Sequence, residues 1–464
     1  MFVNSGQVVF TNRQKSGKIL GNTVLSRITF TERNSAMRRI KIADKVHISF
    51  LPSDKFKTNF LSVNFITELT SQNATGTALL SRVLTRASKN YPTTALLSQK
   101  LQYYYDMTQS ISSYKRGEKL IVSYTSDFLK NAYLPEKDED LVSASVEMFR
   151  EVFFNVLANN GAFDETIVKT EKNDLVNTIR ALINNKNAYA RQKCTEIMCE
   201  NERYSISENG TEENALAMDV KGLYDFYQKL ISTSAVEIFF VGECDEDFLE
   251  KKFADIFASL DRNVLSIRDT EILSQASEEI KEVTECMQVS QGKIAMGFRT
   301  GVSVKDSDSA ALFLMCDIFG GSPVSKLFMN VREKLSLCYY CRSIADSQKG
   351  VMFVLSGIES ANRDKAMNAI LSELSDIQNG NITDEDLDAA KLSLTNSCRE
   401  LDDNPAAYCS WILSRLVCGI ETTPEEFCKE LDKVTISDVV EVSKKIKLDS
   451  VYFLKGNDAS SKEG

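Results

Sequence analysis

The amino-acid sequence predicts an α+β fold built from two homologous halves, each a mostly antiparallel sheet covered by helices. Three observations lead to this prediction. The same order of strands and helices occurs twice along the 464 residues, one block repeats at a constant spacing, and each copy closes with an apolar strand that runs into a glycine. Helices gathered on one face of a sheet are typical of α+β domains.

The first copy begins at residues 59–65, where polar and apolar side chains alternate as in a half-buried strand. An apolar helix is expected at residues 78–87, and a second strand at residues 120–124. Longer helical runs follow. The copy closes with the strand at residues 236–242, whose last residue is glycine.

The second copy repeats this order. Residues 292–298 alternate like a strand, residues 310–319 read as an apolar helix, and residues 351–355 read as a second strand. Its closing strand, residues 451–456, again ends in glycine.

Asn-Gly pairs mark the repeated block. Asn160 and Asn379 are each followed by glycine, then by an acidic cluster, a helical run and a tyrosine, Tyr189 or Tyr408. The spacing between the two asparagines equals that between the two tyrosines, 219 residues. Each Asn-Gly pair is expected to end one helix, and each acidic cluster to begin the next. A duplication therefore explains the pattern better than chance.

Composition favours soluble domains. The acidic, polar residues 261–283 are predicted to link halves at residues 1–260 and 284–464. The formal net charge of −10 argues against the basic face that nucleic-acid binding requires. No apolar run approaches the roughly 20 residues of a membrane-spanning helix. The chain start lacks the pattern of a secretory signal, so we expect a cytoplasmic protein with neither a nucleic-acid nor a membrane partner.

Metal-binding side chains are scarce. The only histidine is His47, which is expected to be a structural residue on a strand. The 11 cysteines are expected to be reduced and mostly buried. Cys338 and Cys341 have the spacing of a redox or zinc pair, but neither a second pair nor a histidine lies near them in the sequence. The sequence therefore predicts no metal site.

One segment, residues 319–340, carries a family resemblance. It contains the Gly320-Gly321 turn, then Arg332 followed by Glu-Lys, then Tyr339 seven residues after the arginine. This pattern resembles the C-terminal signature of the pitrilysin-type (inverzincin) metallopeptidases. The resemblance extends over nearly the whole chain, because that family is built from two homologous α/β-roll halves that form a clamshell.

Two further stretches, residues 51–59 and 86–93, resemble the zinc-less, YmfF-like bacterial subgroup of that family. Residues 1–30 are polar and longer than the family pattern leads us to expect before the first strand. No role is predicted for them.

In active members of the family, a helix carries H-x-x-E-H and a distal glutamate completes the zinc site. Residues four apart share one helix face, so the two imidazoles converge on one ion. The resemblance puts Ala78 and Arg82 at the two histidine positions, Ser81 at the glutamate position and Glu171 at the distal position. None of the first three can replace the lost ligand or base, so we expect zinc only in a partner chain and no cofactor here.

The resemblance also implies a role for the second half. Gly320, Gly321, Arg332 and Tyr339 would bind substrate in trans, and in the family the arginine and tyrosine bind the substrate backbone and the developing oxyanion. The chain would then be the non-catalytic, substrate-binding subunit of a heterodimeric zinc metalloendopeptidase, giving these two donors in trans to a YmfH-like partner. Two alternatives remain open, namely a structural scaffold and a stand-alone peptide-binding chamber without proteolysis.

Overall fold

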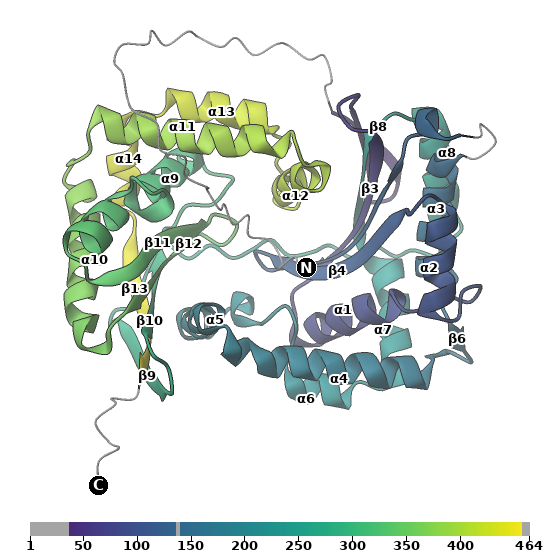
Figure 1. Ribbon diagram of the computed structural model, residues 1–464, viewed down its shortest axis with the longest axis horizontal. Coiled ribbons are helices and arrows are strands. Elements are labelled where there is room, and N and C mark those ends of the chain that lie inside the picture. Colours follow the sequence, from purple (N-terminus) through teal and green to yellow (C-terminus); the bar gives the residue numbers. More distant parts are fainter. Residues whose placement is uncertain (1–36, 136–139, 457–464) are drawn as a thin grey trace.

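The computed structural model describes residues 37–135 and 140–456 and contains two α+β halves side by side (Figure 1). Each half has one main sheet with helices packed against it, so the predicted fold class is confirmed. The expectation about residues 1–30 lies outside the described residues. Residues 261–280 form neither helix nor strand, and the next strand begins at Lys281, within the predicted linker.

The sheet of the N-terminal half is antiparallel except where β2 runs parallel to β8. In spatial order its strands are β1 (Arg38–Ala43), β2 (Val46–Pro52), β8 (Ala235–Gly242), β3 (Thr58–Glu68), β5 (Lys119–Leu129) and β4 (Thr108–Arg116). The predicted strands at residues 59–65, 120–124 and 236–242 are confirmed as parts of β3, β5 and β8.

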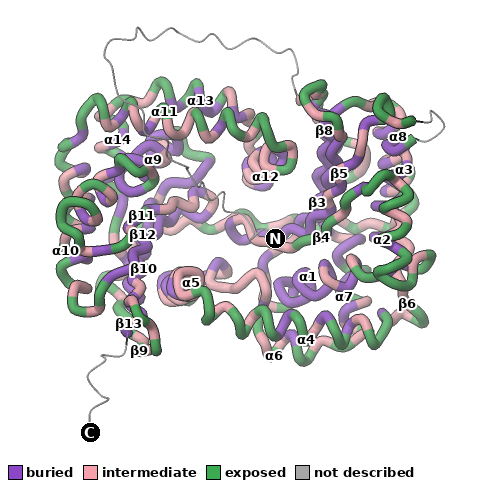
Figure 2. The backbone as a smooth tube through the Cα atoms, viewed as in Figure 1, coloured by how far each residue is buried: buried purple, intermediate pink, exposed green. Residues whose placement is uncertain are grey.

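The helices of this half are α1 (Ser71–Leu84), α2 (Thr94–Tyr103), α3 (Leu141–Phe154), α4 (Glu165–Ala181), α5 (Lys186–Met198), α6 (Glu212–Ala217), α7 (Val220–Thr233) and α8 (Glu246–Ala258). The predicted helix at residues 78–87 has the wrong bounds. Helix α1 starts earlier because the Thr70 hydroxyl caps it by accepting a hydrogen bond from the Asn73 amide, and it ends at Leu84. Figure 2 shows α1 and the central strands as largely buried.

The sheet of the C-terminal half is antiparallel except where β13 runs parallel to β9. In spatial order its strands are β11 (Cys338–Asp346), β12 (Val351–Ile358), β10 (Gly292–Arg299), β13 (Lys447–Gly456) and β9 (Lys281–Met287). Its helices are α9 (Ser309–Cys316), the π-helical turns η4 (Asp317–Gly321) and η5 (Leu327–Lys334), α10 (Arg363–Gln378), α11 (Asp384–Leu401), α12 (Pro405–Leu416), α13 (Pro424–Lys433) and α14 (Ile436–Ser443). The predicted helix at residues 310–319 therefore divides into α9 and η4.

The two sheets share one strand order, which supports the predicted duplication. Strands β4, β5, β3, β8 and β2 correspond to β11, β12, β10, β13 and β9, and the single parallel pair of main-sheet strands falls at the same place in both. One detail of the repeated block is wrong. Asn379 caps α10 as expected, but Asn160 does not end a helix. Asn160 and Gly161, with φ of 52° and 74°, form the turn of a short hairpin between β6 (Ala158–Asn159) and β7 (Ala162–Phe163).

One helix of each half packs on the sheet of the other half. Helix α5 lies against β10 and β13, where Gly297 leaves room for the side chains of Cys194 and Met198. Helix α12 lies in the same way against β3 and β8, where Ile412 and Leu413 join the apolar side chains of the N-terminal sheet. Figure 1 shows both helices between the two sheets. Because these helices carry Tyr189 and Tyr408, the exchange follows the repeat found in the sequence.

A buried ion cluster joins the turn between β4 and β5 to the turn between β11 and β12. Lys349 is 0% exposed, and its Nζ lies 2.6 Å from Glu118 Oε1 and 2.6 Å from Glu202 Oε2. Arg299 pairs with Glu202 at 2.6 Å and with Asp449 at 3.3 Å. Burial acts to raise the pKa of Glu202, but hydrogen bonds from Arg299 and Lys349 outweigh it and lower that pKa. Paired charges from both halves thus meet at one buried point.

We expect Lys349→Met to lower the free energy of unfolding by about 3–5 kcal/mol, because it leaves Glu118 and Glu202 buried without this cation. Urea denaturation of the full chain measures the change. The control is Lys305→Met, which removes an exposed partner of Asp269 and should cost no more than about 1 kcal/mol. Equal, small losses in both variants would show that the cluster does not hold the halves together.

Candidate functional site

The helix that the family resemblance assigns to metal binding is α1, and its side chains are used for packing. Ala78 and Ser81 are buried, and the Ser81 hydroxyl donates a hydrogen bond to the Ala78 carbonyl oxygen at 3.1 Å within the same helix. Arg82 reaches outward to α4, where its Nη2 donates to Thr178 Oγ1 at 3.0 Å. Alanine offers no donor atom, and arginine is a permanent cation that would repel a metal ion.

Glu171 on α4 is 2% exposed, and its carboxylate is paired with an arginine. Its Oε1 lies 2.5 Å from Nε of Arg86, just beyond the end of α1. A buried carboxylate requires a cation or hydrogen-bond donors, and Arg86 supplies both. The structure therefore brings Glu171 to the end of the former metal helix and pairs it with an arginine. The residues of this site do not fit zinc.

Arg86 is a residue that the sequence analysis did not single out, although it opens the 86–93 stretch. The same stretch binds a second carboxylate, that of Glu151 on α3. Glu151 Oε1 accepts from the Ser88 hydroxyl at 2.5 Å and from the Asn90 amide at 3.1 Å, and Oε2 accepts from Asn90 Nδ2 at 3.0 Å. The signal was in the sequence, as a run of donors after an apolar helix, but the carboxylates that it binds lie 63 and 85 residues away.

The 51–59 stretch, the other part that resembles the subgroup, also has a structural role. Lys55 donates to the Asp402 carbonyl oxygen at 3.1 Å and pairs with Asp403, so it crosses to the other half just before α12. Asn59 Oδ1 accepts from the Glu243 amide at 3.0 Å. Gly242, with φ of 129°, is required there, because a Cβ would lie 2.1 Å from Asn59 Oδ1.

His47 lies on β2, as predicted. Its Nδ1 is 3.4 Å from Glu237 Oε1, and Glu237 is also bound by Arg39 at 2.6 Å. This is a small polar cluster on the sheet, not on α1. Within residues 37–135 and 140–456, no group of three or more His, Cys, Asp or Glu side chains is arranged to hold a metal ion.

In the C-terminal half, the Gly320-Gly321 turn brings helix and edge strand together. A Cβ at Gly320 would lie 2.7 Å from the Ser343 amide nitrogen of β11, so only glycine permits this approach. Gly321 sits against Asp317, whose carboxyl is mostly buried. Burial raises the pKa of Asp317 to about 6, while hydrogen bonds from Ser393 and Ser322 act in the opposite direction. The glycines thus set the position of η5 against β11.

Arg332 and Tyr339 lie on these neighbouring elements, which pack against each other. Arg332 is on η5, with its guanidinium carbon 4.5 Å from the centre of the Phe328 ring and its Nη1 3.5 Å from Glu333. Tyr339 is on β11 and is 64% exposed. Its neighbour Tyr340 differs, because its hydroxyl donates to Asn187 Oδ1 of α5 at 2.5 Å. Tyr340 therefore holds the halves together, whereas Tyr339 is open to solvent.

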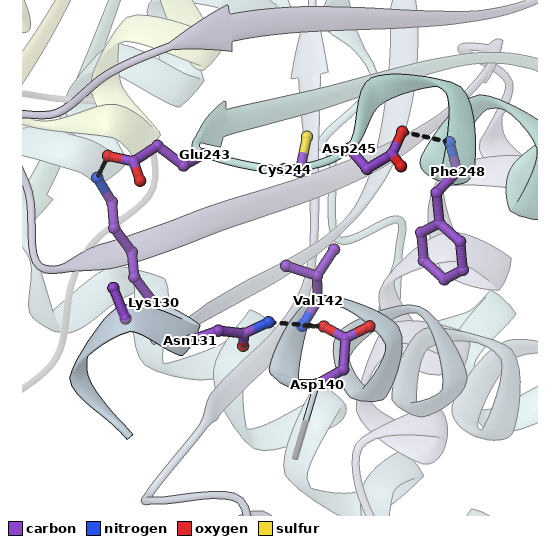
Figure 3. Close-up of a pocket in the computed structure, with 9 residues that line it drawn as sticks. Lys130, Asn131, Asp140, Val142, Glu243, Cys244, Asp245 and Phe248 are labelled. Carbon is purple, nitrogen blue, oxygen red and sulfur yellow. Dashed lines mark hydrogen bonds and ion pairs between the residues drawn. The ribbon is translucent and has the colours of Figure 1, made fainter. Parts of the chain in front are cut away.

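A polar cavity of about 370 Å³ lies elsewhere, where the turns after β5 and β8 meet the starts of α3 and α8 (Figure 3). Lys130 and Glu243 pair across it at 2.8 Å, and the side chains of Asp140 and Asp245 cap the two helices. None of the predicted site residues lines this cavity.

Two matched halves, with no metal-binding set at the positions that the resemblance assigns to zinc, are the features of a metallopeptidase homologue without a catalytic metal site. Residues 217–394 match the family model described as Peptidase M16 inactive domain. The chain is 30% identical over 411 residues to the probable inactive metalloprotease YmfF of Bacillus subtilis, covering 88% of this chain and 95% of that protein. The chain therefore belongs to the M16, or pitrilysin-type, peptidase family, among its zinc-less, YmfF-like members.

Solved structures share the fold of this chain. A conserved protein from Enterococcus faecalis V583 matches with a TM-score of 0.84 and 28% identity, covering 91% of this chain and 99% of that one. The peptidase M16 inactive domain from Pseudomonas fluorescens has the same fold, with a TM-score of 0.72, 15% identity and coverage of 91% and 98%. The chain is not a catalytic peptidase by itself. Among the helices of the described residues, none has the length and apolar character that crossing a membrane requires.

We expect Arg86→Met to destabilise the chain by about 1–3 kcal/mol, because it leaves Glu171 buried without its cation and Arg86 itself is partly exposed. Thermal unfolding measures the loss. The control is Arg180→Met. Arg180 lies on the same helix as Glu171, but it is solvent-exposed and pairs with Glu212. The double variant Arg86→Met with Glu171→Leu should recover most of the loss. A double variant no more stable than Arg86→Met alone would contradict the pairing.

Proposed function

We propose that this chain is the non-catalytic, substrate-binding subunit of a heterodimeric zinc metalloendopeptidase. In this proposal Arg332 and Tyr339 reach the zinc site of a YmfH-like partner, which alone carries the metal. The observation that supports it most is the contrast between the two halves. In the N-terminal half, the assigned metal-site positions hold no metal-binding set, and Glu171 is paired with Arg86. The C-terminal half keeps Arg332 and an exposed Tyr339 on adjoining elements.

The chemistry of the two donors suits peptide binding. A guanidinium offers a fixed cationic fork, and a phenol offers a neutral hydroxyl donor. Both can bind a peptide carbonyl oxygen or the oxyanion that develops from it. Tyr339 makes no hydrogen bond with the described part of the chain, so its hydroxyl is available.

A second chain is favoured because the two halves are fixed to each other. Helices α5 and α12 each pack on the opposite sheet, and the Lys349 cluster joins the central turns. A chamber that opens and closes would then form between two chains and not between the halves of one. Edge strands β4 and β11 offer backbone groups for an extended peptide, which needs little side-chain specificity. The eleven free cysteines are compatible with a cytoplasmic pair.

The scaffold alternative gives no reason for an exposed Tyr339 on the strand that packs against η5, the element that carries Arg332. The stand-alone chamber alternative predicts peptide binding by the isolated chain. Fluorescence anisotropy with an unfolded peptide separates them. Equal affinity with and without the zinc-bearing chain would support the stand-alone chamber, whereas no binding in either sample would support the scaffold.

We expect a mixture of this chain with a zinc-bearing M16 homologue to cleave peptides that neither chain cleaves alone. Arg332→Ala with Tyr339→Phe should lower kcat by about 10²–10³, the usual cost of losing an oxyanion donor. The matched control is Arg150→Ala with Tyr133→Phe, which changes an exposed arginine and an exposed tyrosine of the other half. Full activity with the Arg332/Tyr339 double variant would overturn the proposed role in trans.

A further inference from the structure

The strand that carries Tyr339 begins with a β-bulge, and the bulge aligns two cysteines. Cys338 pairs with Ile358 of β12, but Cys341 pairs with Ser356, only two residues away. Tyr339 is the extra residue between them. Side chains two ladder positions apart point to the same face, and their Cα atoms are about 7 Å apart. That separation is at the upper end of the range that a disulfide spans.

The two thiols already contact each other. Each thiol acts on the pKa of the other, and the Ser356 hydroxyl, which donates to the Tyr340 carbonyl oxygen at 2.8 Å, acts on both. Both are mostly buried in the core of the C-terminal half, with exposed fractions of 9% and 4%. Cys338 is the more accessible, because it opens β11 directly after the exposed residues that end η5.

Their surroundings make the two sulfur atoms chemically unequal. The hydrogen bond from Cys341 lowers the pKa of Cys338 to about 7, against the effect of burial, with smaller contributions from Ser356 and from the Arg332 charge. The same contact and burial raise the pKa of Cys341. The Cys338 sulfur is thus the more readily ionised of the two and the one able to attack, while Cys341 remains a thiol beside it.

We propose that Cys338 and Cys341 form a redox-active dithiol that a hydroperoxide converts to a disulfide. The Cys338 thiolate attacks the terminal peroxide oxygen and the O–O bond breaks; with one proton from the solvent, the products are a Cys338 sulfenic acid and one alcohol, or one water in the case of hydrogen peroxide. Cys341 then attacks the sulfenic sulfur, and its thiol proton and the hydroxyl leave as water. Two thiols are oxidised, and one peroxide accepts both electrons.

The location of the dithiol gives this oxidation a consequence, which rests on the proposed function. Closing the disulfide pulls together the two ends of the bulge from which Tyr339 projects, and it removes the thiolate beside Arg332. Both donors of the candidate site are then displaced or altered. Oxidation would lower peptide binding by the paired enzyme, whereas the disulfide itself forms in the isolated chain.

A second thiol pair provides an internal comparison. Cys398 on α11 and Cys428 on α13 are paired in a similar way, since their contact lowers the pKa of Cys428 and raises that of Cys398, while Asp432 and Glu425 act to raise the pKa of Cys428. Arg332 acts on Cys338, the thiol that attacks, whereas Arg415 acts on Cys398, the thiol of the second pair whose pKa is raised. Cys286 of β9 is exposed, so its oxidation shows what solvent accessibility alone produces without a neighbouring thiol partner.

The test is peptide mapping after treatment of the full chain with about one equivalent of hydrogen peroxide. One tryptic peptide, residues 335–342, carries both cysteines. We expect this peptide to lose two hydrogens and to resist alkylation unless first reduced. Cys341→Ser should instead leave a sulfenic acid on Cys338 that dimedone traps, and Cys286→Ser should change nothing.

The rate of alkylation of Cys338 should rise as pH increases through about 7. At pH 7 this rate should be at least about tenfold higher than that of a thiol of ordinary pKa.

Oxidation at Cys286 or at Cys398 and Cys428, with residues 335–342 still reduced, would overturn the proposal. This outcome is read from the unmodified chain, so it does not depend on whether a variant folds. The consequence for the site is tested separately with the two-chain mixture. If the disulfide forms and peptidase activity is unchanged, the redox pair stands and its link to substrate binding is wrong.

Discussion

The buried ammonium of Lys349 fixes the relation between the two halves, and the rest of the structure depends on that relation. It lies on the turn of one sheet and is surrounded by carboxylates from the other half, Glu118 and Glu202. Charges buried this deeply tolerate almost no displacement, because any loss of pairing leaves an unsolvated ion. The exchanged helices α5 and α12 add apolar packing across the same boundary. A chain held in this way presents a single rigid surface.

Under the proposed function, this rigidity lets one chain provide half of an active site. Beside α1, the helix that the family resemblance assigns to metal binding, Glu171 is paired with Arg86. The edge strand β11 remains open, with Tyr339 exposed on its bulge and Arg332 on the neighbouring π-helical turn. The bulge gives the exposed residue its direction and also brings Cys338 and Cys341 to one face. Substrate binding and redox chemistry would then share one element of backbone.

Much of the fold could be predicted from the sequence. Alternation and apolar runs identified β3, β5, β8, β10, β12 and β13, because a buried strand needs a regular pattern of apolar side chains. The exchange of α5 and α12 could not be predicted, since an apolar helix face does not indicate which sheet it covers. Asn160 was misplaced because an Asn-Gly pair suits a hairpin turn as well as a helix end.

The candidate site was predictable to a similar degree. The family resemblance assigns Ala78, Ser81 and Arg82 to the metal-site positions, and residue chemistry then shows that they cannot bind zinc. The pairing of Glu171 with Arg86 depends on how α1 and α4 lie together, and the alignment of Cys338 with Cys341 depends on one bulge.

The central claim is that this chain holds no zinc. Equilibrium dialysis of the isolated chain against zinc, with the bound metal measured by mass spectrometry, tests this claim most directly. We expect far less than one zinc per chain. One tightly bound zinc per chain that disappears in Glu171→Gln would contradict the account.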